Sequence, residues 1–469
     1  MKLGQTIFTI FLILQLSDPI KLAAQEPVDP PSTYMFPAYG HSYGIRKAGP
    51  TELFLFLGLR VKFSDPQGLA CVRLNSWDDP EDPHDDDEVT VYGVNSGQDN
   101  IIYNSSMWGL GVYGPDQDPP GNLSRPHGIC ANRYGDVYVA DTGHHRIVRL
   151  SNQGHQLEFV SAFGDSGDAP GQFDYPLQVA MDSGGNIYVS DNRNHRVQVF
   201  DHRHRLRFVF NDHRNMLFPD GIAITDSAEI HRYRNDNFII VIDSANQRIS
   251  KFSLNGELIK RTRMSQIGYA GAWLTYVCID YYNQLHITDL ENHCLHKFDK
   301  ELNHIVSFGS YGEEDHQFVE PRGIAIYRRF GQLFIAEKNG AQYYWIGTDI
   351  LDPEIVKAGN RYDITFRITE PSFISAEIFD QQGGFIRRLA EKQFLPEAGI
   401  QHLAWNRKAG TYRDKFYQDK GYRKSIITNK GQDVAAGIYR LRLVAEATYS
   451  SRSYFYREIN KLITINDHD

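Results

Sequence analysis

The sequence predicts an all-β protein in which a six-bladed β-propeller is followed by a second all-β module. Two observations predict this fold class. A segment of short apolar or alternating runs, separated by turns, recurs along most of the chain, and longer alternating runs replace it after Asp349. Recurrence about every 40 to 50 residues, with several strands in each copy, is typical of propeller blades.

The repeated unit is clearest at residues 126–150, PHGICANRYGDVYVADTGHHRIVRL. Its runs GICAN, DVYVAD and IVRL are separated by turns, and LEFVSAFG follows after another turn. Short alternating runs between turns predict antiparallel strands. Four such strands make one propeller blade, so each copy predicts one blade.

One polar position that closes the second strand aligns the copies. In chain order this position holds Asn95, Asp141, Asp191, Asp243, Asp289 and Glu337. The successive spacings are 46, 50, 52, 46 and 48 residues. A repeat of this length predicts six blades.

The copies resemble the NHL repeat family in a Pro-x-Gly start, a second strand that ends in Asp, a short turn and an Arg-apolar exit. The Arg is kept at Arg146, Arg196 and Arg248, and it is replaced by Asn100, Cys294 and Gln342. The resemblance covers roughly residues 65–348 and implies a six-bladed NHL-type β-propeller. Because Asp accepts hydrogen bonds from turn N–H groups and Arg pairs with it, we interpret this element as structural and expect no catalytic residue in it.

Residues 1–24 have the layout of a signal peptide, with Lys2, an apolar run at 7–16 and small residues before Gln25. We therefore expect a secreted, periplasmic or cell-surface protein without a membrane span in the mature chain. An uncleaved N-terminal anchor is the alternative. Residues 25–50 are rich in Pro, Gly and Tyr and predict an extended segment.

The propeller domain is predicted over residues 51–350. Its last copy has three strands, in GIAIY, QLFIAE and QYYWIG, and lacks the outer one. Residues 52–59, ELFLFLGL, are predicted to supply that outer strand. Both ends of the propeller would then meet in one blade, which removes free sheet edges.

Residues 353–469 resemble the immunoglobulin-like domain of the FlgD type. The matching features are DQQGG at residues 380–384, Trp405 and AGIYRL at residues 436–441, whereas the insertion at 407–429 departs from the family pattern. The resemblance implies an immunoglobulin-like β-sandwich. Such a domain serves as a spacer or stabilising domain, or as a secretion or surface-attachment signal.

The composition narrows the function classes. The chain has 49 Lys and Arg residues against 58 Asp and Glu residues, a net charge of −9, which argues against binding to nucleic acid or anionic membranes. Four cysteines in 469 residues do not make a disulfide scaffold, and no CxxC or Cys/His metal spacing is present. We expect a monomer.

Two local runs of charged residues favour interpretations that involve no specific binding site. The acidic run at residues 75–88 lacks the Gly-punctuated loop of a calcium site and favours a solvated loop. The Arg and His residues at 192–214 divide between opposite rims of the third blade, so we interpret them as surface charge.

Ligands of propellers usually bind where loops surround the central channel. The starts of the first strands and the turns between the second and third strands lie on this face. The starts hold Gln67, His127, Leu177, Asp220, Thr275 and Arg322, and the turns add His144, His145, Arg193, His195, Gln247 and His293.

Five of these residues form the predicted ligand-binding set, namely His127, Asp220, Arg322, His144 and His195. Arg322 would anchor a small polar or anionic ligand, and His127 would be a pH-sensitive donor. The alternative is that these side chains only solvate a wide channel.

The sequence thus favours a binding or interaction module, for a protein or a small polar ligand, without a cofactor. The alternative is a metal-dependent hydrolase or lyase, lactonase-like or amidating-lyase-like, with Ca²⁺ or Zn²⁺ in the channel. Lyases of this type hold zinc through His residues at the first-strand starts of several blades, but among these starts Pro-His occurs only at His127. A calcium site needs several carboxylates, and Asp220 is the only acid among the starts. A third hypothesis is a structural cell-surface component whose propeller binds no small molecule.

Overall fold

The computed structural model describes residues 31–37, 46–76, 89–106, 109–114, 116–153, 156–212, 215–410, 412–417, 422–427, 431–449 and 455–466. The predicted signal peptide and the acidic residues 77–88 lie outside this range. The elements below belong to one compact unit, Ser32–Asp469. In the described part of the chain, no helix is long and apolar enough to cross a membrane.

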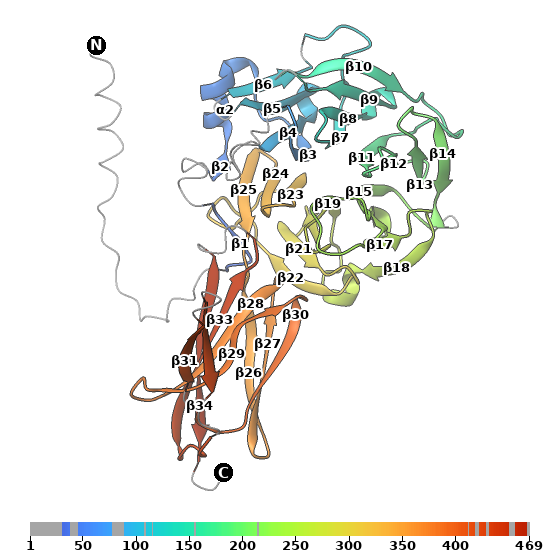
Figure 1. Cartoon of the computed structure of the whole chain (residues 1–469). Coiled ribbons are helices and arrows are strands. Elements are labelled where there is room, and N and C mark those ends of the chain that lie inside the picture. Colours follow the sequence, from blue (N-terminus) through green and yellow to red (C-terminus); the bar gives the residue numbers. More distant parts are fainter. Residues whose placement is uncertain are drawn as a thin grey trace, which may run out of the picture. The chain divides into compact units, whose positions relative to one another are not determined.

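Six antiparallel sheets surround a common centre and form the blades of the propeller (Figure 1). Five blades consist of four consecutive strands. The first two blades contain β3 (Pro66–Arg73), β4 (Val89–Asn95), β5 (Asn100–Ser106) and β6 (Gly109–Tyr113), then β7 (Pro126–Ala131), β8 (Asp136–Asp141), β9 (Arg146–Ser151) and β10 (Glu158–Phe163).

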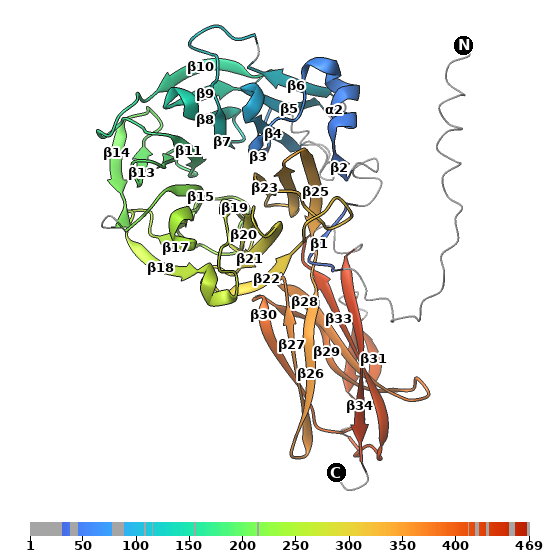
Figure 2. The ribbon, with the colours of Figure 1, turned by 180° about the vertical axis from the view of Figure 1, so that it is seen from behind.

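Blades three to five repeat this arrangement, which Figure 2 shows from the opposite side. Blade three contains β11 (Pro176–Met181), β12 (Ile187–Asp191), β13 (Arg196–Phe200) and β14 (Leu206–Phe210). Blade four contains β15 (Pro219–Thr225), β16 (Phe238–Asp243), β17 (Arg248–Phe252) and β18 (Leu258–Arg263). Blade five contains β19 (Leu274–Ile279), β20 (Leu285–Asp289), β21 (Cys294–Phe298) and β22 (His304–Phe308).

The first strands of the blades form a closed ring around the channel, in which each contacts the next and β23 (Ile324–Tyr327) contacts β3. The glycine of the Pro-x-Gly start allows this close approach. A Cβ atom on Gly323 would lie 2.0 Å from the carbonyl oxygen of Gln67, and one on Gly128 would lie 2.6 Å from that of Leu177. Behind the ring, alternating apolar residues of neighbouring blades share common cores, as Ala140 and Val179 do between blades two and three.

Blade six receives its outer edge from the N-terminal region. Its sheet runs from β23 through β24 (Gln332–Glu337) to β25 (Gly340–Ile346), and two short strands, β1 (Tyr34–Met35) and β2 (Lys47–Ala48), both pair with β25. Tyr34 pairs with Ile346 and is fully buried. Residues more than three hundred positions apart in the sequence therefore complete one sheet.

The outer strand predicted at residues 52–59 is wrong. These residues form the helix α2 (Pro50–Leu57) and a 3₁₀ turn, η1 (Gly58–Arg60). Pro50 begins the helix, and the Gly49 N–H donates to Glu52 Oε2 at 2.8 Å, which stabilises the first turn. A continuous apolar run fits a helix as well as a strand, and β1 and β2 already occupy the free edge.

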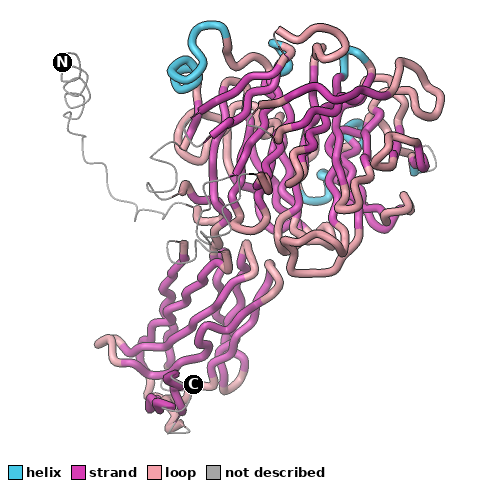
Figure 3. Tube along the Cα trace, turned by 45° about the horizontal axis from the view of Figure 1, so that its top comes forward, coloured by secondary structure: helices cyan, strands magenta, loops and turns pink. Residues whose placement is uncertain are grey.

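After the propeller, the named elements of the described residues are all strands (Figure 3). One sheet contains β26 (Ile350–Ala358), β27 (Arg361–Ile368) and β30 (Gly399–Trp405). The other contains β29 (Phe385–Leu395), β28 (Ser372–Asp380), β33 (Gly437–Ala447) and β34 (Tyr456–Ile465). Both sheets contribute to one buried core, for example through Ile364, Trp405 and Leu443, so the module is a β-sandwich. The insertion at 407–429 contains a hairpin, β31 (Tyr412–Tyr417) and β32 (Tyr422–Ile427).

Buried polar contacts join the sandwich to the propeller. Glu370, between β27 and β28, pairs with Lys297 of blade five and accepts a hydrogen bond from Gln284 at 2.8 Å. On the same blade, His286 contacts the hydroxyl of Tyr34 through Nδ1 at 2.6 Å. The N-terminal strand, blade five and the sandwich thus meet in one polar network.

Candidate functional site

The channel mouth is the face of the propeller on which the first strands begin and the turns between second and third strands lie. In blades two to five each turn follows the Asp that the repeat predicts, and blade two shows how this Asp fixes it. Asp141 accepts a hydrogen bond from the Ser124 N–H at 2.7 Å and pairs with Arg146 Nε at 2.7 Å. Arg146 also donates to the carbonyl oxygen of Asn122 at 2.7 Å. The structural interpretation of the Asp and Arg element is confirmed.

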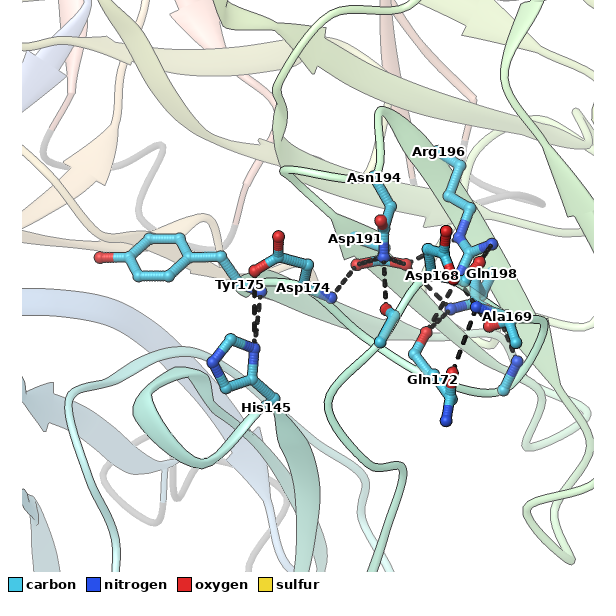
Figure 4. Close-up of polar contacts among 12 residues, drawn as sticks. His145, Asp168, Ala169, Gln172, Asp174, Tyr175, Asp191, Asn194, Arg196 and Gln198 are labelled. Carbon is cyan, nitrogen blue, oxygen red and sulfur yellow. Dashed lines mark hydrogen bonds and ion pairs between the residues drawn. The ribbon is translucent and has the colours of Figure 1, made fainter.

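Blade three repeats this geometry around Asp191 (Figure 4). The Asp191 carboxylate accepts hydrogen bonds from Arg196 Nε at 2.7 Å and from Asn194 Nδ2 at 2.9 Å. Gln198, seven residues after the Asp, donates to the same carboxylate at 3.0 Å. The fully buried Asp191 is therefore satisfied by neighbouring polar groups, which fits a structural role.

The predicted residue His144 belongs to this structural element. Its Nδ1 lies 2.9 Å from Asp141 Oδ2, the carboxylate oxygen that also pairs with Arg146. A side chain held in this way stabilises the turn.

The predicted residue His195 connects two blades. The Phe218 N–H donates to His195 Nδ1 at 3.1 Å, and both residues have a left-handed φ, 52° and 56°. Equivalent hydrogen bonds join Tyr175 N–H to His145 at 3.3 Å, which Figure 4 shows, and Glu320 N–H to His293 at 3.0 Å. These histidines accept from the residue that precedes the next blade's first strand, a role that the sequence did not reveal.

The third predicted residue, Arg322, lies at the mouth with its charge already balanced. Its guanidinium pairs with Asp65 and with Glu320 Oε2, the latter at 3.0 Å. Its side chain is only 15% exposed. A guanidinium between two carboxylates has little remaining attraction for an anion.

His127 lies close to this cluster and is partly buried. Burial lowers its pKa to about 4, with Arg322 and Arg125 lowering it further and Asp65 opposing them. The imidazole is therefore neutral at neutral pH, with one donor and one acceptor nitrogen. Its ring centroid lies 6.0 Å from that of Tyr175.

Asp220 is the predicted residue with the fewest partners. Its only hydrogen bond among the described residues comes from Ser244 Oγ, at 3.5 Å. Burial raises its pKa to about 7, and the Ser244 hydroxyl only partly opposes that shift. Near neutral pH, the protonated and the ionised forms of this carboxyl group are therefore both populated. The Tyr276 phenol has its pKa raised by burial and then by Asp220, so the two side chains share the mouth.

Exposed aromatic residues precede the first strands of blades four and five. Phe218, two residues before Asp220, is 43% exposed, and Trp273, which precedes the first strand of the next blade, is 54% exposed. Tyr175 holds the corresponding place in blade three and is covered by the guanidinium of Arg193 at 4.3 Å. Blades three to five thus present aromatic rings, whereas blades six and one present Glu320, Arg322 and Asp65.

Below the mouth the channel is narrow, with a volume of about 180 Å³, and is lined mainly by small and aliphatic side chains of the first strands. Cys71, Cys130 and Cys278 lie in this lining. Burial raises the pKa of Cys130 to about 12, so this thiol stays protonated and unreactive. Arg328 also lines the channel, and it donates to the carbonyl oxygen of Ile224 at 3.0 Å.

Across the described ranges, one group of side chains brings three potential metal-ligand atoms within 4.8 Å of one another, and it consists of Asp289, Cys294 and His296. All three are buried in blade five. The predicted residues at the mouth form no such group. The signal for this group in the sequence is the replacement of Arg by Cys294 together with a His two residues later on the same strand.

The NHL repeat family matches residues 123–150 and 173–200. No curated protein matches the chain. Among solved structures, a catalytically inactive virginiamycin B lyase from Staphylococcus aureus with quinupristin is 15% identical, with a TM-score of 0.43, over 61% of this chain and 82% of the lyase. A gluconolactonase from Xanthomonas campestris is 12% identical, with a TM-score of 0.42, over 68% of this chain and 99% of the other.

At these values the similarity assigns no activity to the chain. The sheets and the repeats define its class. The protein is an all-β propeller with NHL repeats, followed by a β-sandwich.

Proposed function

We propose that this protein is an exported binding module whose ligand occupies the channel mouth. The observation that carries the proposal is the Asp220 carboxyl, which the protein satisfies with a single 3.5 Å hydrogen bond. Phe218 and Trp273, which precede the first strands of blades four and five, expose their rings on the same face of the propeller. Polar groups that lack strong partners next to apolar rings are typical of small-molecule sites.

The chemistry of the mouth favours a small polar ligand without negative charge. Hydroxyl or amino groups of such a ligand would donate to Asp220, and an apolar ring face would lie on Phe218 or Trp273. Arg322 was expected to anchor an anion, but Asp65 and Glu320 balance its charge. The local carboxylates also repel anions.

Ligand binding tests the proposal directly. Isothermal titration calorimetry would compare a panel of neutral sugars, amino sugars, aromatic amines and small carboxylates with the wild-type chain. Binding of a hydroxyl- or amine-bearing compound should weaken at least tenfold in Asp220→Asn and in Trp273→Ala. Tyr134→Ala is the control, because Tyr134 is 59% exposed in a turn between first and second strands, away from the mouth. Equal affinity in all four proteins would overturn the proposal.

The metal-dependent hydrolase or lyase was the alternative. Such an enzyme would need several ligand atoms gathered at the mouth. His127 and Asp220 do not belong to a group of three such atoms among the described residues, so no observation favours this second function.

We also propose that the sandwich is an immunoglobulin-like domain of the FlgD type that stabilises the propeller, in a secreted, periplasmic or cell-surface protein. The buried pair of Lys297 and Glu370 supports a stabilising role over that of a loose spacer. Fractionation of cells that express the full chain, with N-terminal sequencing of the mature protein, tests export. Recovery of uncleaved protein in the cytoplasm would overturn that part.

A further inference from the structure

Blades two to four share a pairing between Asp and Arg that blade five lacks. Asp289 and Cys294 face each other across β20 and β21, and His296 lies two residues beyond Cys294 on the same strand. Residues two apart on a strand point to the same side of the sheet. Three ligand-type side chains are therefore presented together where blades two to four place an Arg.

The loss of that Arg removes a positive charge. In blade three, Asp191 is balanced by Arg196 at 2.7 Å, with Gln198 as an additional donor. In blade five, Cys294 replaces the Arg and His296 replaces the Gln. Asp289 is fully buried, and its carboxylate accepts hydrogen bonds from Asn292 Nδ2 at 2.7 Å and from the Trp273 N–H at 3.1 Å, but no Arg or Lys pairs with it among the described residues.

The distances suit a tetrahedral cation. His296 Nε2 lies 3.0 Å from Asp289 Oδ2 and 3.7 Å from Cys294 Sγ. Zinc bonds of about 2.0 Å to nitrogen or oxygen and about 2.3 Å to sulfur separate tetrahedral ligand atoms by about 3.3 to 3.6 Å.

Hydrogen bonds outside the cluster orient the His296 ring. Ser307 Oγ lies 2.7 Å from His296 Nδ1 and 2.9 Å from His304 Nε2. Zinc binding would use the tautomer in which His296 Nδ1 donates to Ser307 Oγ and the lone pair of Nε2 faces the ion.

We propose that Asp289 Oδ2, Cys294 Sγ and His296 Nε2 bind a structural zinc ion that replaces the missing Arg of blade five. Carboxylate, thiolate and imidazole are all zinc ligands, and binding releases the thiol proton to solvent. A fourth position remains for an oxygen ligand. Because the three side chains are buried, the ion stabilises the blade and takes no part in ligand binding at the mouth.

Metal content tests the site in the full mature chain, purified without a polyhistidine tag under reducing conditions. After dialysis against a small excess of zinc chloride and then buffer, mass spectrometry should find about one more zinc ion per chain in the wild type than in Cys294→Ala. Cys278→Ala, which removes a thiol of the channel lining, should retain the wild-type content. Cobalt in place of zinc should give a thiolate charge-transfer band that Cys294→Ala lacks.

The double variant Cys294→Arg with His296→Gln rebuilds the arrangement of Arg196 and Gln198. It should bind no zinc at this site, and its Tm should not respond to a chelator, whereas the wild-type Tm should fall by several degrees. Equal zinc content in the wild type and Cys294→Ala, or a wild-type Tm unaffected by the chelator, would overturn the proposal.

Discussion

The ammonium group of Lys297 and the carboxylate of Glu370 form an ion pair in which neither side chain is exposed to solvent. Lys297 lies on β21 of blade five, and Glu370 lies in the connection between β27 and β28 of the sandwich. Burial raises the pKa of Glu370 above its usual range, with Lys297 opposing the shift. A carboxylate in this place therefore depends on its cationic partner.

Removal of one member of this pair should be far more harmful than removal of both. Lys297→Met should lower the free energy of unfolding by about 3 to 5 kcal/mol, because it leaves a buried carboxylate unpaired. Lys297→Met combined with Glu370→Leu should recover most of that loss. Urea denaturation at pH 7 measures both. Loss of the exposed pair of Arg361 and Asp363 should cost less than about 1 kcal/mol, and a double variant as unstable as the single one would contradict the prediction.

Ring closure should depend on Gly323. Its α-hydrogen faces the Gln67 carbonyl oxygen, and a Cβ atom would lie 2.0 Å away, so Gly323→Ala should separate blade six from blade one. We expect a loss of at least about 2 kcal/mol in the free energy of unfolding, as for other strained backbone contacts. Gly184→Ala, where the nearest neighbour is a flexible side-chain atom at 3.3 Å, should change it little. Thermal unfolding of the two variants tests this prediction, and equal Tm values for Gly323→Ala and Gly184→Ala would contradict it.

Stability should depend on pH through Asp220. Its pKa is raised to about 7 in the folded protein, so between roughly pH 4 and 7 the folded state holds a proton that the unfolded state has lost. Stability contributed by this group is therefore present at low pH and lost as pH rises through 7. Asp220→Asn should become more stable relative to wild type with rising pH, by up to about 1.4 kcal/mol for each unit of pKa difference.

His127 has the opposite sign. Its pKa is lowered to about 4, so below about 6.5 the unfolded state takes up a proton that the folded state does not, and stability falls as pH falls. His127→Gln should weaken this acid sensitivity. Urea midpoints between pH 5 and 8 separate the two variants, with the exposed Asp118→Asn as control. Parallel curves for all the proteins would show that neither side chain titrates as described.

His195 should act through the backbone of the next blade. His195→Ala removes the acceptor of the Phe218 N–H and places alanine at a left-handed φ, so we expect a loss of about 1 to 3 kcal/mol. His195→Asn should recover most of it, because Asn tolerates this φ and retains an acceptor. Asp99 already serves in this way, since its Oδ1 accepts from Arg125 N–H at 2.6 Å. Chemical denaturation measures the rescue, and equal losses in the two variants would assign His195 another role.

The repeat was predictable because its residues act within one blade. Asp141 and Arg146 are close in sequence, and their contact follows from the turn alone. The role of His195 was not predictable, because it depends on the φ of Phe218 and on how two blades meet. The balanced charge of Arg322 was hidden for the same reason, since Asp65 lies at the other end of the propeller sequence.

The closing strands were missed for a different reason. Tyr34–Met35 and Lys47–Ala48 are two residues each, too short for any alternation to appear. The continuous apolar run at 52–59 favoured a strand prediction, although the residues form a helix in which only Leu53 is buried. The two short strands are fixed by β25, far away in the sequence.

This distance has a consequence for the making of the protein. Tyr34 is synthesised early but cannot pair until Ile346 has emerged, so the first strand waits for almost the whole propeller. Closing so long a loop carries a large entropic cost, and native pairing that spans it comes late in folding. The sixth blade, and with it the ring, therefore closes only after the other five blades have been synthesised.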